Sequence, residues 1–409
     1  MSVTKKLLIW KKAASLTALF ILYFGSGNLA AQEKPKPEEP KINPLEIKTP
    51  DSLLPQLPNN ATISAEQQAK LKLSLEELNT QAAALLKAGK APEAFEIWYR
   101  EMRLRRALGY LEEVQALGRV GEIAWQNNQK FDVQLITARL VTIQKEAEDK
   151  KSLNLKLLQA LGAAYQQVRV PGPAITVYQQ ILADARQRQD SSAQVSTLNT
   201  IAQLHLAWFD YPNAAKTYEE LLAFAKAKND SVNEVVYLKQ LVYIYTQAKQ
   251  SEQALVVKQQ LEKTYIAQQE LTQLAPLKIE IASDYEALNQ PDKASKIYQE
   301  AYSLASSLRQ LAYASEALQK LGALYRTHNQ PQFALEVYDI LIKVEEQSAN
   351  SYGLMYAYDQ IGQIHLAQKN YAKSLAAFKE GLSFAKLLHY QESYFNSQIE
   401  RVNKQSSQK

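Results

Sequence analysis

The side chains of this sequence that could act in catalysis or metal binding are four histidines and several pairs of adjacent acids. No two histidines have the HxxxH or HExxH spacing that holds zinc on one helix. Neighbouring carboxylates such as Glu112 and Glu113 point about 100° apart on a helix, so they do not form an acid–base pair. The phosphate-binding motif GxxxxGK followed by Ser or Thr is missing, as are GxGxxG and GxSxG. We therefore predict no catalytic residue, no metal site and no cofactor, and we expect that the protein is not an enzyme.

A short arginine-rich segment could bind anions. Arg100, Arg103 and Arg106 are spaced by three residues, which places each on the same helix face as the next. Such a face could contact an anionic membrane or an acidic partner. The alternative is that these arginines form ion pairs with acids close in the sequence, namely Glu96, Glu101 or Glu112.

Composition excludes several classes of protein. Of the 409 residues, 46% are hydrophobic and 22% are charged, which is enough apolar content for a large core. Because there is no cysteine, a disulfide scaffold and a Cys-ligated metal are excluded. The net charge of +5 falls to +1 without the four lysines of residues 1–31. A nearly neutral body lacks the concentrated basic surface of nucleic-acid-binding proteins, so we expect no nucleic-acid partner.

Residues 1–31 have the three parts of a secretory signal. Four lysines precede an apolar run from Ala13 to Phe24, and small residues follow as far as Ala31. The run is shorter than the roughly 20 residues of a transmembrane helix. We expect a signal peptide cleaved near Ala30 or Ala31, with an uncleaved signal anchor as the alternative. In both cases the body is exported to the periplasm, to a membrane surface that faces it, or to an equivalent lumen.

Residues 32–64 form a predicted proline-rich linker. Seven of the 14 prolines of the chain lie between residues 33 and 58. Proline lacks a backbone N–H and disrupts helices, so such a stretch favours extended polyproline II. We interpret it as a semi-rigid spacer between a membrane and the following domain. A proline-rich ligand for another protein is the alternative.

The rest of the chain repeats with a period of 40 residues. In most units an aromatic or histidine follows a small residue after three positions, an alanine follows after twelve, and a second aromatic lies four further on. The small column comprises Ala82, Gly162, Ala202, Ala282, Gly322 and Gly362. The second aromatic column comprises Trp98, Tyr178, Tyr218, Tyr298, Tyr338 and Phe378. His205 and His365 occupy the first aromatic column, and we expect them to pack in the core as Tyr285 does in its unit.

Within each unit the apolar and small residues recur at helical spacing. Leu161 and Tyr165 share one face of a first helix, and Val177 and Ile181 share one face of a second. Asn and Gly followed by Pro mark the turns between helices. Three residues are expected to cap the helices that follow them, namely Asp190, Asp230 and Asn350. No unit has the alternating pattern of a strand, so we predict an all-α fold.

These columns resemble the tetratricopeptide repeat (TPR). Two units carry its pattern most clearly, one as Gly162, Tyr165, Ala174 and Tyr178 and the other as Gly322, Tyr325, Ala334 and Tyr338. The resemblance covers about residues 65–400, with units of 40 rather than the usual 34 residues. It implies a right-handed superhelical solenoid of about eight helix-turn-helix units, followed by a polar tail at residues 401–409.

Two units depart from the pattern. The unit around residues 121–160 has Gln134 and Ala138 where alanine and an aromatic are expected. The unit around residues 241–280 has Lys258 in the second aromatic column. We expect these two units to be distorted or to form a special surface.

In TPR proteins the first helices of successive units line a concave groove that binds other proteins. The resemblance therefore implies a partner-binding groove in this chain. Its expected residues are Lys156, Gln159, Asn199, Gln203, Lys239, Tyr243, Gln319, Arg326, Tyr356 and Asp359. Amide side chains can bind a peptide backbone, and Tyr243 offers flat contact area. The sequence does not reproduce the Lys/Asn/Lys/Arg clamp of TPR domains that bind chaperone tails.

We interpret the chain as a protein–protein interaction scaffold or assembly factor outside the cytoplasm, with a protein or extended peptide as its partner. One alternative is a periplasmic TPR factor associated with photosystem II assembly and processing. Another is an envelope or membrane-surface-associated structural protein that acts through Arg100, Arg103 and Arg106. The sequence leaves the partner and the oligomeric state open.

Overall fold

The computed structural model describes residues 43–54 and 63–408. The predicted signal sequence of residues 1–31 lies outside the described residues, as does much of the predicted linker. Among the described residues, no helix combines the length and the apolar character that crossing a bilayer requires.

The all-α prediction is confirmed, since the described residues form seventeen α-helices, two 3-10 helices and no strand. The 3-10 helices are η1 (Arg106–Leu108) and η2 (Leu271–Gln273). The α-helices are α1 (Ala65–Lys87), α2 (Ala91–Arg105), α3 (Tyr110–Gln126), α4 (Lys130–Asp149), α5 (Leu155–Gln167), α6 (Pro171–Gln187), α7 (Ser191–Ala207), α8 (Tyr211–Ala227), α9 (Ser231–Gln247), α10 (Ser251–Ala267), α11 (Leu274–Ala287), α12 (Pro291–Ser307), α13 (Leu311–Thr327), α14 (Pro331–Gln347), α15 (Ser351–Ala367), α16 (Tyr371–Leu388) and α17 (Glu392–Ser406).

Local sequence signals set the helix boundaries. From α6 to α16 a helix begins every 20 residues, except α11, which begins three residues late. Every turn in this series holds one residue with positive φ, such as Asn229 at 53° and Asn329 at 57°, where asparagine tolerates the left-handed conformation. The expected caps are confirmed, because the side chains of three residues each accept a hydrogen bond from a backbone N–H three residues later, namely Asp190, Asp230 and Asn350.

The repeated columns form the core. The rings of Tyr298, Tyr338 and Phe378 are fully buried, and His205 is buried as expected. Tyr285 and His365 need a correction, because both are only partly buried. The Tyr285 hydroxyl accepts a hydrogen bond from the Gln259 amide at 3.1 Å.

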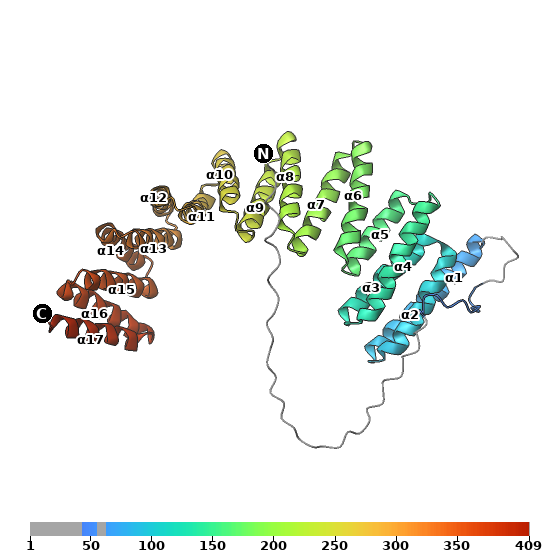
Figure 1. The fold of residues 1–409 in the computed structure, drawn as a ribbon, viewed down its shortest axis with the longest axis horizontal. Helices are drawn as coiled ribbons and strands as arrows, with labels where there is room; N and C mark the ends of the chain where they lie inside the picture. The colour runs from blue at the N-terminus through green and yellow to red at the C-terminus, as the bar shows by residue number, and fades with distance from the viewer. Residues whose placement is uncertain (1–42, 55–62, 409) are drawn as a thin grey trace, which may run out of the picture.

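The helices follow one another along an arc (Figure 1). From α5 to α15 the odd-numbered helices lie on the inner side of this arc and the even-numbered helices lie on the outer side. Consecutive helices pack against each other as antiparallel neighbours, so each unit buries apolar surface between its own two helices and against the neighbouring units.

The regular packing changes in the two units that depart from the repeat. In the first, α4 makes little contact with α5, and α3 packs directly against α5 instead. Gly118 of α3 allows this approach, because a Cβ there would lie 3.0 Å from the Cα of Ala164. In the second, η2 takes the place of the first turn of α11.

Part of the predicted linker is packed against the solenoid. In residues 43–54, Leu45 is completely buried in the core of the first helices. The Arg103 side chain donates a hydrogen bond to the Pro44 carbonyl, and Arg100 donates two to the Asp51 carboxylate at 2.7 and 2.8 Å. This part of the chain is therefore a strap on α2 rather than a spacer.

Candidate functional site

The residues predicted for the groove lie on inner helices, but the structure does not gather them into one site. Lys156 and Gln159 lie on α5, Asn199 and Gln203 on α7, Lys239 and Tyr243 on α9, Gln319 and Arg326 on α13, and Tyr356 and Asp359 on α15. Of these ten, only Lys239 and Tyr243 line the largest cavity described below.

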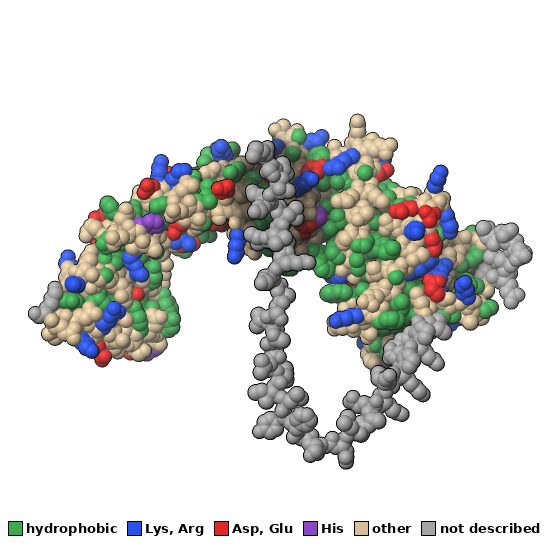
Figure 2. All heavy atoms as spheres, viewed as in Figure 1, with side chains coloured by type: hydrophobic (Ala, Val, Ile, Leu, Met, Phe, Trp, Pro, Cys, Tyr) green, Lys and Arg blue, Asp and Glu red, His purple; other side chains and the backbone are tan. Residues whose placement is uncertain are grey.

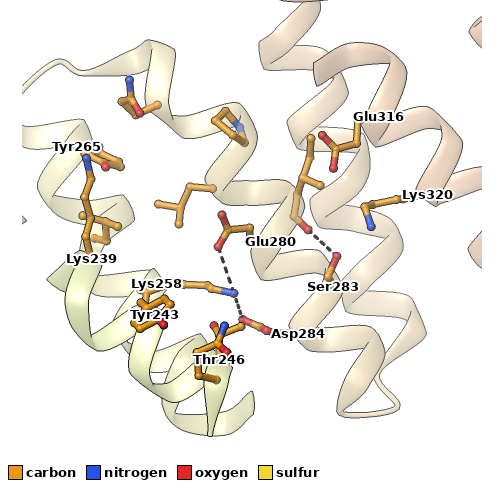
Figure 3. Close-up of a pocket in the computed structure, with 17 residues that line it drawn as sticks. Lys239, Tyr243, Thr246, Lys258, Tyr265, Glu280, Ser283, Asp284, Glu316 and Lys320 are labelled. Carbon is orange, nitrogen blue, oxygen red and sulfur yellow. Dashed lines mark hydrogen bonds and ion pairs between the residues drawn. The ribbon is translucent and has the colours of Figure 1, made fainter. Parts of the chain in front are cut away.

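That cavity has a volume of about 660 Å³ and lies between α9, α10, α11 and α13 (Figure 3). It adjoins η2, where the helix spacing is irregular. A volume of this size is within the range of about 300–1,000 Å³ that ligand pockets span. The lining includes Lys239, Tyr243, Thr246, Lys258, Tyr265, Glu280, Ser283, Asp284, Glu316 and Lys320.

Lys258 of α10 is the unusual residue of the cavity. Only 3% of its surface is exposed, although lysine is rarely buried. Its Nζ lies 2.8 Å from Oδ2 of Asp284 and 3.4 Å from Oε2 of Glu280 (Figure 3). Both carboxylates come from α11, so the buried ammonium joins the two sides of the irregular α10–α11 junction.

Asp284 balances the charge of Lys258. Burial raises the pKa of the Asp284 carboxyl above its usual range, and the Lys258 ammonium offsets part of that rise. Removal of either partner would leave an uncompensated charge away from water, which is strongly destabilising. The pair therefore keeps polar groups at the bottom of the cavity where an aromatic ring packs in other units.

The two walls of the cavity present opposite charges. On the α9 wall, the Lys239 Nζ lies 5.8 Å from the centroid of the Tyr265 ring, and no carboxylate among the described residues lies within ion-pair distance of it. On the opposite wall, 56% of the Glu280 side chain is exposed, and Glu316 is exposed on α13. Lys320 lies one turn beyond Glu316 (Figure 3).

An apolar stripe on α9 extends from this cavity. Val232, Val236 and Tyr243 are 73%, 45% and 49% exposed. Their spacing of four and seven residues places them on one face of the helix. Exposed apolar side chains that share one helix face are typical of an interaction site.

Gln203 lines a second cavity, of about 290 Å³, between the hairpin α5–α6 and α7. Trp208, Tyr165 and Tyr178 supply aromatic walls, and Arg169 is at its edge. Trp208 is half exposed. This cavity lies two units from the first along the solenoid.

The remaining groove residues have the following contacts. Lys156 and Gln159 are exposed. The Asn199 amide donates to the Val195 carbonyl at 2.9 Å, and Gln319 donates to Ser315 Oγ at 3.0 Å. The side chain of Arg326 donates to that of Gln360.

Tyr356 contacts the preceding helix α14, whereas Asp359 contacts the last helix α17. The Tyr356 ring lies edge-on to Tyr338, with centroids 6.3 Å apart. Asp359 accepts a hydrogen bond from the Tyr394 hydroxyl at 2.8 Å. Burial raises the pKa of the Asp359 carboxyl, while that hydrogen bond lowers it.

The arginines proposed as an anionic-surface patch all have partners inside the chain. Arg100 pairs with Asp51, Arg103 binds the Pro44 carbonyl, and Arg106 Nε lies 2.8 Å from Glu113 Oε1. Figure 2 shows acidic and basic side chains intermixed over these first helices. The positive charge is therefore largely compensated within the protein.

Sequence reasoning did not assign Glu280 or Asp284 to the site. The signal that pointed to this region was Lys258, whose place in an aromatic column marked the unit as irregular. Among the described residues, no group of three His, Asp or Glu side chains could hold a metal ion.

The fold and the cavity define a solenoid of helical hairpins with a ligand-sized cavity on its inner side. No family model matches the sequence, and no curated protein is similar to it. Solved structures of TPR-like repeat proteins do resemble it. BtubC (BKLC) from P. vanneervenii is 17% identical, with a TM-score of 0.38 over 53% of this chain and 91% of that chain.

Two further structures carry TPR or TPR-like repeats. A putative kinesin light chain from Podosopora anserina with nearly identical TPR-like repeats is 17% identical, with a TM-score of 0.35 over 48% of this chain and 97% of that chain. A signal transduction ATPase from Pyrococcus horikoshii with a TPR sensor is 15% identical, with a TM-score of 0.40 over 80% of this chain and 55% of that chain. At these identities the likeness concerns the helical repeat alone.

Proposed function

We propose that this protein is an interaction scaffold, or assembly factor, that binds an extended segment of another protein on the inner side of its solenoid. The observation that carries the proposal is the cavity of about 660 Å³ between α9 and α13. It lies next to the exposed Val232–Val236–Tyr243 stripe, so apolar area and a recess for a side chain adjoin each other.

The site has the character of a binding surface rather than a catalytic centre. Its buried ionisable groups, Lys258 and Asp284, pair with each other at 2.8 Å, and the Ser283 hydroxyl is engaged with the Ile279 carbonyl at 3.1 Å and the Tyr298 hydroxyl at 3.0 Å. Recognition through Tyr243 and a buried central recess would follow the pattern of other interfaces, in which a few aromatic and charged residues dominate binding.

A crosslinked pull-down tests this function. Cells that express the tagged full chain are crosslinked and solubilised, and captured proteins are identified by mass spectrometry. We expect a defined partner that is lost with Lys239→Glu/Tyr243→Ala and retained with Lys343→Glu/Leu387→Ala, which changes exposed residues on α14 and α16. A partner retained by both variants would contradict binding at this site.

We also propose that the body functions outside the cytoplasm, in the periplasm or an equivalent lumen. The order of charged, apolar and small residues in positions 1–31 supports this location. Fractionation of cells that express the chain with and without residues 2–31 tests it. Retention of both forms in the cytoplasm would contradict export.

The membrane-surface alternative has less support, because Arg100, Arg103 and Arg106 are engaged within the chain. It predicts salt-sensitive binding to vesicles that contain anionic lipid. Vesicle co-sedimentation at low and high salt separates it from binding of a protein segment.

A further inference from the structure

The cavity occupies the place where other units pack an aromatic ring. In regular units the ring of the second aromatic column packs against the small-column residue sixteen positions earlier, as Tyr338 does against Gly322. In the irregular unit these two positions are Lys258 and Val242, and both line the cavity. The side chain of Lys258 turns to the carboxylates of α11 instead of filling this space.

The residues around this space are of the kind that pack against an aromatic side chain. Tyr243 and Tyr265 line one side, and Pro276, Leu277 and Ile279 line the other. Aromatic rings prefer edge-to-face or offset contacts with one another, which add to the effect of burial. A partner can therefore supply the aromatic ring that this unit lacks at Lys258.

The charges at the rim of the cavity determine which charged residues of a partner would flank such a ring. Lys258 and Asp284 compensate each other, which leaves the rim residues to meet a partner. The α9 wall then carries the positive Lys239. The α11–α13 wall carries Glu280, Glu316 and Lys320, which sum to one negative charge. A partner that crosses from α9 to α13 thus meets a positive wall first and a negative wall second.

From this geometry we infer that the cavity receives a tyrosine or phenylalanine side chain of an extended protein segment, flanked by an acidic residue on the α9 side and a basic residue on the α13 side. The inference rests on the proposed function and specifies the chemistry of its partner. Complementary rim charges of this kind set specificity and direction of binding more than raw affinity.

A phage-displayed random peptide library, panned on the purified full chain, tests the inference without a known partner. We expect enriched peptides to share an aromatic residue with an acid on one side and a base on the other. Each enriched peptide should bind Lys239→Glu about fivefold to tenfold more weakly. Panning on Lys239→Glu should select peptides with a base in place of the acid, and Lys343→Glu should leave the selection unchanged.

A second variant tests the missing-ring argument. Lys258→Tyr/Asp284→Asn restores an aromatic at the column position and removes the carboxylate that Lys258 would leave unpaired. We expect this variant to show the helical circular dichroism of the wild type and to bind the selected peptides at least tenfold more weakly. Full binding by this folded variant would overturn the inference.

The outcomes separate the two proposals. Enrichment of peptides without an aromatic, or without the charge pattern, would overturn the inference while leaving peptide binding intact. If a folded wild-type chain retains no peptide at all, both the inference and binding of an extended segment at this cavity fail.

Discussion

The ring of Tyr338 on α14 lies against the backbone of Gly322 on α13. A Cβ at Gly322 would be 2.6 Å from both Cε1 and Cζ of that ring. The same relationship joins Gly162 to Tyr178 and Gly362 to the Phe378 ring. The small column and the second aromatic column are therefore two sides of one contact, which holds the two helices of a unit together.

This contact predicts the effect of Gly322→Ala. The added methyl group must displace the fully buried Tyr338 ring, so we expect the free energy of unfolding to fall by about 1–3 kcal/mol. Chemical denaturation measures the change. The control is Gly172→Ala, where nothing lies within 4 Å of a Cβ, and an equal loss in both variants would contradict the steric explanation.

The strap of residues 43–54 predicts that Leu45 stabilises the first helices. Leu45 is completely buried, so Leu45→Ala should lower the free energy of unfolding by about 2–5 kcal/mol. Because units interact mainly with their neighbours, we expect hydrogen exchange to increase in α2 and to stay unchanged in α14. A change spread evenly along the solenoid would contradict this localisation.

The ion pair between Asp51 and Arg100 makes the stability contributed by the strap depend on pH. Its hydrogen bonds with Arg100 hold the pKa of the Asp51 carboxyl below its usual range. A carboxyl whose pKa is lower in the folded than in the unfolded protein stabilises the fold at pH values above the ordinary Asp pKa. This stabilisation is lost as the pH falls through the pKa of the folded state. Asp51→Asn should therefore destabilise the protein at pH 7, by about 1 kcal/mol, with the difference vanishing in acid. Denaturation of both proteins across this pH range checks the sign.

The buried ion pair of Lys258 predicts that removal of its charge destabilises the protein. Lys258→Met leaves the buried Asp284 carboxylate without its cation, which should cost about 3 kcal/mol at pH 7. Burial raises the pKa of Asp284 in the folded protein. The loss of stability should therefore grow as the pH rises from the ordinary Asp pKa through the pKa of the folded state. Lys258→Met/Asp284→Leu should recover most of the stability. Thermal unfolding at pH 4 and pH 7 measures both effects.

Phe209 predicts a stabilising substitution. It has a φ of 59°, a conformation that bulky side chains disfavour, and it is 74% exposed. Phe209→Asn should therefore stabilise the protein by about 0.5–1 kcal/mol, because asparagine tolerates this backbone and little burial is lost. The reverse change Asn229→Phe, at the residue with positive φ in the next turn along the chain, should destabilise it. Denaturation midpoints that move in the same direction for both variants would contradict the backbone argument.

The sequence by itself determined the all-α class, the helix boundaries and most of the core. These follow from local physics, since the helical period, the capping residues Asp190 and Asp230, and prolines such as Pro331 act within a few residues of themselves. The repeat then copies the same contacts along the chain, so one interpreted unit predicted its neighbours. Burial was less predictable, because some rings of the aromatic columns, such as Tyr178, Tyr285 and Tyr325, are only partly buried.

Only the tertiary structure decided which polar residues meet. Lys258 in an aromatic column marked an irregular unit, but its pairing with Asp284 requires α10 and α11 to pack against each other. The strap on α2 likewise required Arg100 and Asp51 to meet across 49 residues. Such contacts join helices whose relative position no short-range pattern encodes, and they therefore decide where the candidate site lies.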